Sequence, residues 1–125
     1  METAERAWRL VGVVGFLGVA LGAFGAHGLA PLLQAHEQVA NWKTATLYHL
    51  VHAAVLAAVA AGRPRFLVAC QWFFGMGILI FSGTLYLMGV TGWRWLGAIT
   101  PVGGLLLLVG WGLLLASGWR KRVSA

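Results

Sequence analysis

The chain has 125 residues, of which 60% are hydrophobic and only 10% charged, whereas an ordinary soluble domain carries about 25% charged residues. With a mean hydropathy of +0.82, this composition excludes a soluble globular domain and predicts one membrane domain over residues 1–125. The net charge of +6 comes from short basic clusters between apolar runs, a pattern that indicates membrane orientation and excludes a nucleic-acid partner.

The first predicted element is a spanning helix over residues 10–29, an uncharged run long enough to cross a hydrocarbon core of about 30 Å. A cleavable signal peptide is the rival interpretation, but the run is too long for a typical signal core. Glycines at steps of three and four form one face of this helix, and alanines in the next run predict a matching face. They are Gly15, Gly18, Gly22 and Gly25 against Ala54, Ala57, Ala58 and Ala61. The glycine spacing is also compatible with a dimer.

The segment over residues 30–43 is the only long connection, and its apolar and polar residues alternate as in a short amphipathic helix on the outer membrane surface. It is placed to act as a lid. Three further spans follow over residues 44–62, 66–90 and 95–119, separated by turns at residues 63–65 and 91–94. Because lipid offers the backbone no hydrogen-bond partners, each span must be helical. The predicted fold class is an all-α integral membrane four-helix bundle.

Basic residues lie unevenly on the two sides of this predicted bundle. Four crossings place both termini and the turn at Arg63 on one side, together with Arg6, Arg9, Arg63, Arg65, Arg120, Lys121 and Arg122. The other side holds only Lys43 and Arg94. The positive-inside rule therefore predicts that both termini face the cytoplasm.

Polar side chains within the spans gather toward the predicted outer end. The candidate ligand-binding residues are His27, Thr44, Tyr48, His52, Ser82, Tyr86 and Thr100. Steps of four place Thr44, Tyr48 and His52 on one helix face and Ser82 with Tyr86 on another, and these faces are expected to meet in a small polar pocket. Pro101, followed by two glycines, predicts a loosened start of the fourth span. The alternative is that these groups only hydrogen-bond between helices, an interpretation favoured for His49.

The remaining chemistry of the chain gives little support to catalysis or metal binding. The spans contain no Asp, Glu, Lys or Arg, which disfavours ion-coupled transport. No acid is available within them to orient a serine–histidine pair, so the sequence leans against an enzyme. Cys70 is the single cysteine, and no ligand motif fixes a metal site, so no cofactor is expected. A metal or haem site at His27 and His52 stays open as a third hypothesis.

Four phrases along nearly the whole chain carry a family resemblance. They are Gly22-Ala23-Phe24-Gly25-Ala26-His27-Gly28-Leu29, Trp42-Lys43-Thr44-Ala45, Phe81-Ser82-Gly83-Thr84-Leu85-Tyr86-Leu87 and Leu96-Gly97-Ala98-Ile99-Thr100-Pro101-Val102-Gly103-Gly104. In these phrases the chain resembles the family called domain of unknown function 423, whose animal relatives are named transmembrane protein 256. The resemblance implies a four-helix protein of the bacterial inner membrane and no established activity.

The leading functional hypothesis is a non-enzymatic bundle that binds a small amphipathic or lipid-like molecule in the outer polar pocket. Its expected partners are membrane lipids and a lipophilic small molecule. The alternative is a structural or assembly subunit, whose partner is a second copy or another membrane protein.

Overall fold

The computed structural model describes residues 2–123, with side chains as far as residue 118. Its elements in chain order are α1 (Glu2–Ala26), α2 (Ala30–Ala35), α3 (Val39–Gly62), α4 (Leu67–Thr91), the 3-10 helix η1 (Arg94–Ala98) and α5 (Thr100–Val123). No strand occurs in this part of the chain, and four of its helices are long and apolar enough to cross a membrane. The predicted all-α integral membrane four-helix bundle is thereby confirmed.

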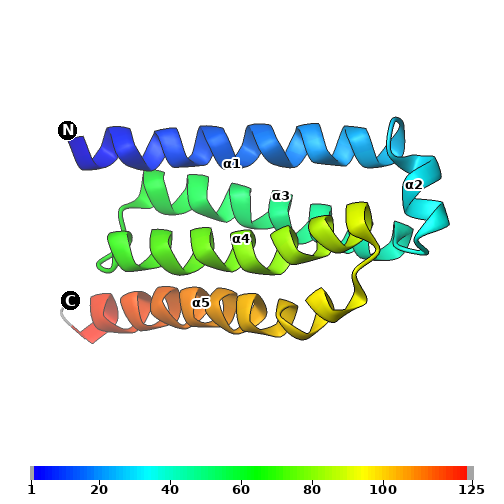
Figure 1. The fold of residues 1–125 in the computed structure, drawn as a ribbon. Helices are drawn as coiled ribbons and strands as arrows, with labels where there is room; N and C mark the ends of the chain where they lie inside the picture. Colours follow the sequence, from blue (N-terminus) through cyan, green and yellow to red (C-terminus); the bar gives the residue numbers. More distant parts are fainter. Residues whose placement is uncertain (1, 124–125) are drawn as a thin grey trace.

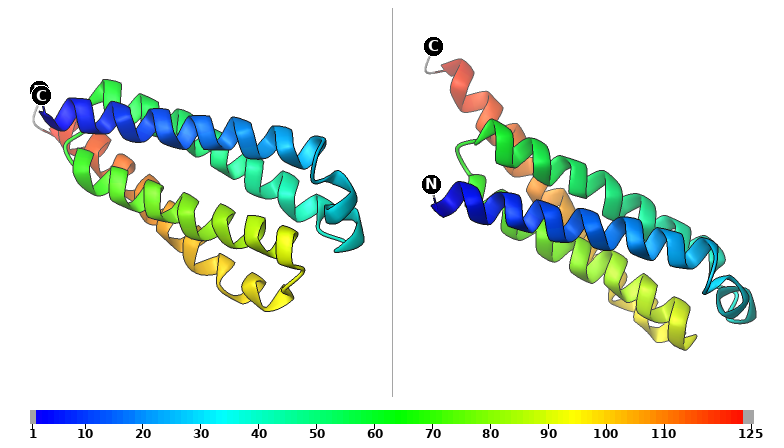
Figure 2. Two further views of the ribbon diagram at one scale, coloured as in Figure 1. Left: turned by 45° about the horizontal axis from the view of Figure 1, so that its top comes forward. Right: turned by 90° about the horizontal axis from the view of Figure 1, so that it is seen from above.

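The four long helices run up and down in chain order. Helices α3 and α4 form the central pair, α1 packs on α3, and α5 packs on α4 (Figure 1). The start of α1, the α3–α4 turn and the end of α5 lie at one end of the bundle, which we call the termini end. The opposite end carries α2 and η1, and we call it the α2 end (Figure 2).

Helix α1 begins at Glu2 rather than at residue 10. Two acidic residues in the first turn suit the positive end of the helix dipole, and Glu2 pairs with Arg6 one turn later. The helix therefore extends through residues 2–9, on the N-terminal side of the apolar run.

The connection between the first two spans contains the expected short helical segment, but it is brief. Helix α2 covers only Ala30–Ala35, and Leu33 on its inner side is 1% exposed. Glu37 then adopts a φ of 56°, a left-handed conformation that few non-glycine residues take. This residue separates α2 from α3, which begins at Val39 rather than at residue 44.

Close packing of α1 on α3 depends on the predicted glycine face, but its partner face differs from the prediction. A Cβ at Gly18 would lie 2.7 Å from Leu50 Cδ2, one at Gly22 would lie 3.0 Å from Thr46 Cγ2, and one at Gly25 would overlap the Trp42 indole. The predicted alanine partner is wrong, because the antiparallel register sets the second half of α1 against the first half of α3. Of that alanine row, Ala54, Ala58 and Ala61 are exposed.

The start of α5 is regular, so the predicted loosening at Pro101 is also wrong. Pro101 occupies the first turn of the helix, where the missing N–H would have had no intrahelical partner. Gly103 serves a different purpose, since an added Cβ there would collide with the Phe81 backbone. The glycine lets α5 approach α4 closely.

Two apolar clusters form the interior. The cluster at the α2 end consists of Leu33, Trp42, Ala45, Leu85, Tyr86, Met88 and Leu96. The cluster toward the termini end consists of Leu56, Val59, Cys70, Phe74, Ile78 and Leu107. Large apolar side chains such as Phe16 and Leu115, which are 74% and 78% exposed, cover the outside and suit contact with lipid.

Candidate functional site

An open recess of about 530 Å³ lies at the α2 end, where four elements meet. Its lining residues are Glu37 and Gln38 from the turn before α3, Asn41 from α3, Phe81, Leu85 and Met88 from α4, Arg94 and Gly97 from η1, and Thr100 and Pro101 from α5. No residue of α2 itself lines the recess, so the turn after α2 is its boundary. Polar groups therefore surround an apolar floor formed by α4.

An ion pair closes one side of the recess. Arg94 Nη2 donates to Glu37 Oε2 at 2.7 Å, which ties the α2–α3 turn to η1. Gly92, with a φ of 74°, ends α4 and turns the chain into η1. Both side chains of the pair are well exposed, so water screens the attraction and the pair is easily opened.

Two further polar pairs include residues that line this recess. Asn41 Nδ2 donates to Gln38 Oε1 at 2.7 Å, and this leaves the Gln38 amino group and the Asn41 oxygen for other partners. Thr84 and Thr100 share a hydrogen bond of 2.7 Å between their hydroxyls, which links α4 to α5. Of the predicted site residues, only Thr100 lines this recess.

Tyr86 meets His49 rather than the expected face of α3. His49 Nε2 lies 2.8 Å from the Val14 carbonyl oxygen, which can only accept, so this nitrogen is the donor. His49 Nδ1 therefore accepts from the Tyr86 hydroxyl, 2.9 Å away. The imidazole is neutral in this arrangement, and it joins α1, α3 and α4.

Ser82 lies one turn before Tyr86 and is likewise engaged in packing. Ser82 is 1% exposed, and its hydroxyl donates to the Ala45 carbonyl at 2.7 Å. Trp42, at the same end, donates from its indole nitrogen to the Leu21 carbonyl at 2.9 Å. Both side chains therefore donate hydrogen bonds to backbone oxygens of neighbouring helices.

His52 occupies a different place, halfway along α3. Its Nδ1 donates to the Tyr48 carbonyl at 2.8 Å, and its Nε2 accepts from the Trp111 indole at 3.1 Å. Tyr48 stacks on the His52 ring but is 41% exposed. His52 is thus a neutral link between α3 and α5.

The remaining predicted site residues do not join the others. His27 and Thr44 are exposed, and His27 lies in the turn after α1 at the α2 end. Helix α3 starts at Val39, at the same end of the bundle as His27, and His52 lies about 20 Å further along this helix at 1.5 Å per residue. The two imidazoles are therefore at different depths. They cannot face one another across a haem. Among residues 2–118, no group of three or more His, Cys, Asp or Glu side chains is placed to hold a metal ion.

The inter-helix hydrogen-bonding role favoured for His49 is confirmed, since this residue bonds groups of α1 and α4. Its burial is also visible in the sequence, because Trp42, Ala45, His49, His52 and Leu56 follow a helical stripe of steps of three and four. Other residues that the structure brings together were missed. No sequence pattern points to His36, yet its Nδ1 donates to the Gly89 carbonyl at 2.9 Å and fastens the α2 turn to α4. The Glu37–Arg94 pair had no comparable sequence signal, since the two residues lie far apart in the chain.

Comparisons with known proteins place these features in a wider group. The family described as "Protein of unknown function (DUF423)" matches residues 21–104. The UPF0382 membrane protein SSP2132 of Staphylococcus saprophyticus is 42% identical over 108 residues, which cover 84% of this chain and 88% of that protein. The UPF0382 inner membrane protein YgdD of Escherichia coli K12 is 37% identical over 115 residues, covering 88% and 86%. No solved structure matches the chain.

Proposed function

The chain belongs to the DUF423 family of membrane proteins of unknown function, and from this starting point we propose that it binds a small amphipathic molecule in the α2-end recess without changing it chemically. The observation that carries the proposal is the two-sided lining of the recess. Its floor is apolar and its rim carries charged, amide and hydroxyl groups. Ligand sites commonly combine such an apolar body with a few polar groups that fix orientation.

The rim offers hydrogen-bonding groups of both kinds to a polar head. Gln38 and Asn41 use only one donor and one acceptor on each other, and the exposed Arg94 guanidinium has N–H groups beyond the one bonded to Glu37. An apolar tail would lie along the α4 side chains Phe81 and Leu85. A head with hydroxyl or carbonyl oxygens and a short apolar body suits this lining.

The orientation of the protein decides which leaflet supplies the ligand. The termini end carries seven basic residues and the α2 end carries two, so the positive-inside rule places both termini in the cytoplasm. In a bacterial inner membrane, the location that its E. coli relative has in its name, the recess would then open toward the outer leaflet. A lipid or quinone-like compound of that leaflet is the expected ligand class.

Mass spectrometry of the gently purified protein tests the proposal. Wild-type protein should retain a defined lipophile, and Arg94→Gln should lower its occupancy several-fold. Lys43→Gln is the matched control, because Lys43 is exposed at the same end but does not line the recess. Gly97→Phe should also lower occupancy, since a Cβ there meets only Met88 Sδ, at 3.9 Å, and the ring can enter the recess. Identical bulk lipid in all four proteins would refute the proposal.

An assembly subunit is the second candidate, favoured by the exposure of α1. Of the 18-residue apolar stretch of α1, only 6% of the residues are buried within the bundle, against 44% for the corresponding stretch of α4. Added Cβ atoms at Gly12 and Gly15 meet nothing within 4 Å, so another helix can approach this side closely. A photo-cross-linker at Val19 in native membranes should then capture one defined protein, while recess variants leave lipophile content unchanged.

A further inference from the structure

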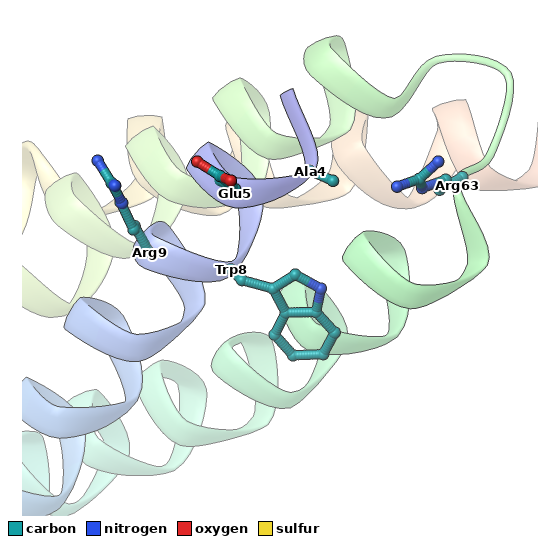
Figure 3. Close-up of a pocket in the computed structure, with 5 residues that line it drawn as sticks. All are labelled: Ala4, Glu5, Trp8, Arg9 and Arg63. Carbon is teal, nitrogen blue, oxygen red and sulfur yellow. The ribbon is translucent and has the colours of Figure 1, made fainter. Parts of the chain in front are cut away.

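A second recess, of about 630 Å³, lies at the termini end, where α1 passes the turn after α3. It is lined by Ala4, Glu5, Trp8 and Arg9 of α1 and by Arg63 (Figure 3). Glu5 and Arg9 project from the same side of α1, and Arg63 extends from its turn toward Ala4. The small Ala4 side chain leaves the space between Glu5 and Arg63 open.

The charged groups of this recess are available to a ligand. Glu2 is paired with Arg6, but within the described chain Glu5, Arg9 and Arg63 take part in no ion pair. Glu5 and Arg63 therefore bring one carboxylate and one guanidinium group to the recess, whereas the Arg9 guanidinium lies on the far side of Glu5 from Arg63 (Figure 3). Guanidinium groups match phosphate oxygens in geometry and charge, and a carboxylate is the natural acceptor for an ammonium group.

The position of the recess points to a membrane molecule. It lies beside the first turns of α1, before the uncharged run from residue 10 begins. Trp8 in its wall is 51% exposed, and indole rings prefer the headgroup level of a bilayer. Arg63 ends α3 in a left-handed conformation with a φ of 45°, and its backbone N–H bonds the Val59 carbonyl, so the base of its side chain is fixed. A phospholipid headgroup is the molecule that lies at this depth.

We propose that this recess binds a phospholipid headgroup that carries both a phosphate and a primary ammonium, as phosphoethanolamine does. The phosphate accepts hydrogen bonds from the Arg63 guanidinium, and the ammonium donates to the Glu5 carboxylate. The acyl chains pass Trp8 and continue along the apolar outside of α1. The site is separate from the α2-end recess and does not depend on what that recess binds.

Native mass spectrometry of the full chain, released from detergent and titrated with dioleoyl lipids, tests the proposal. Phosphatidylethanolamine should bind more tightly than phosphatidylglycerol, which lacks the ammonium, and than phosphatidylcholine, whose quaternary ammonium has no N–H. Arg63→Gln should weaken phosphatidylethanolamine binding about fivefold. Arg65→Gln is the matched control, because it removes the same charge at the same end from a residue outside the recess, whose guanidinium lies over the Phe66 ring.

A further variant tests the contact of the Glu5 carboxylate, and a soluble compound tests whether the ligand is a membrane lipid. Glu5→Gln should abolish the preference for phosphatidylethanolamine over phosphatidylglycerol. Equal losses in Arg63→Gln and Arg65→Gln would overturn the site in favour of general surface charge. An unchanged preference in Glu5→Gln would overturn the ammonium contact. Soluble phosphoethanolamine binding as tightly as the lipid would overturn the assignment to a membrane lipid.

Discussion

Replacing Gly25 with alanine should destabilise the bundle, whereas the same replacement at Gly12 should not. Both glycines lie in α1, and alanine is intrinsically better in a helix by about 0.5–1 kcal/mol. A Cβ at Gly12 meets nothing within 4 Å, but one at Gly25 overlaps the Trp42 indole. The difference between the two variants therefore isolates the contact between α1 and Trp42.

The expected size follows from what Trp42 must give up. Trp42 is 3% exposed, and its indole nitrogen donates to the Leu21 carbonyl at 2.9 Å. The centroid of its ring lies 4.7 Å from that of the Tyr86 ring. Displacing it loses a hydrogen bond of about 1 kcal/mol and adds overpacking of about 1–3 kcal/mol. After the gain in helix propensity, Gly25→Ala should be about 1–3 kcal/mol less stable than wild type.

Thermal unfolding in detergent, followed by far-ultraviolet circular dichroism, measures this difference. Gly25→Ala should melt at least about 5 °C below wild type, and Gly12→Ala at or slightly above it. Trp42→Phe combined with Gly25→Ala should show less than the sum of the two single losses, because a smaller ring makes room for the methyl group. Equal melting temperatures for Gly25→Ala and Gly12→Ala would refute the proposed packing of α1 on α3.

Two further predictions concern the buried network and the orientation. Tyr86→Phe should lower the free energy of unfolding by about 1 kcal/mol, because the His49 Nδ1 acceptor is left without its donor; Tyr48→Phe, at an exposed position, should have a smaller effect on the same melting curve. In a cysteine-free background, a cysteine replacing the exposed Ala35 should react with a membrane-impermeant maleimide in intact cells. One replacing the exposed Arg65 should react only after lysis, and the reverse pattern would invert the orientation.

The four helices could be predicted because lipid leaves the backbone few alternatives. An apolar run without charges must form a helix where it crosses the membrane, and Arg63-Pro64-Arg65 and Gly92 mark turns that the structure places at the same positions. Helix ends were harder, because they depend on local contacts. Helix α1 begins at Glu2, where acidic residues occupy the first turn and Glu2 pairs with Arg6, and no hydropathy pattern encodes these contacts.

The facing of helices could be predicted only in part. Glycines at regular steps show that something approaches α1, but they do not say what. Alanines were the expected partners, whereas the large Trp42 ring fills the notch at Gly25. Small residues admit either a close backbone or a large side chain, so composition alone cannot choose between them.

The use of hydrogen-bonding groups separates the polar residues into two kinds. His49 and His52 engage both ring nitrogens, and Ser82 donates its only proton to a backbone carbonyl. A ligand that approached these groups would have to break bonds that hold helices together, and buried groups left unpaired cost about 1–3 kcal/mol each. Gln38 and Arg94 retain N–H groups beyond the bonds they make within the chain. For this reason we assign the interior histidines to stability and the rim of the α2-end recess to binding, a division that the variants Arg94→Gln and Tyr86→Phe distinguish, since the first should release a ligand and the second should lower stability.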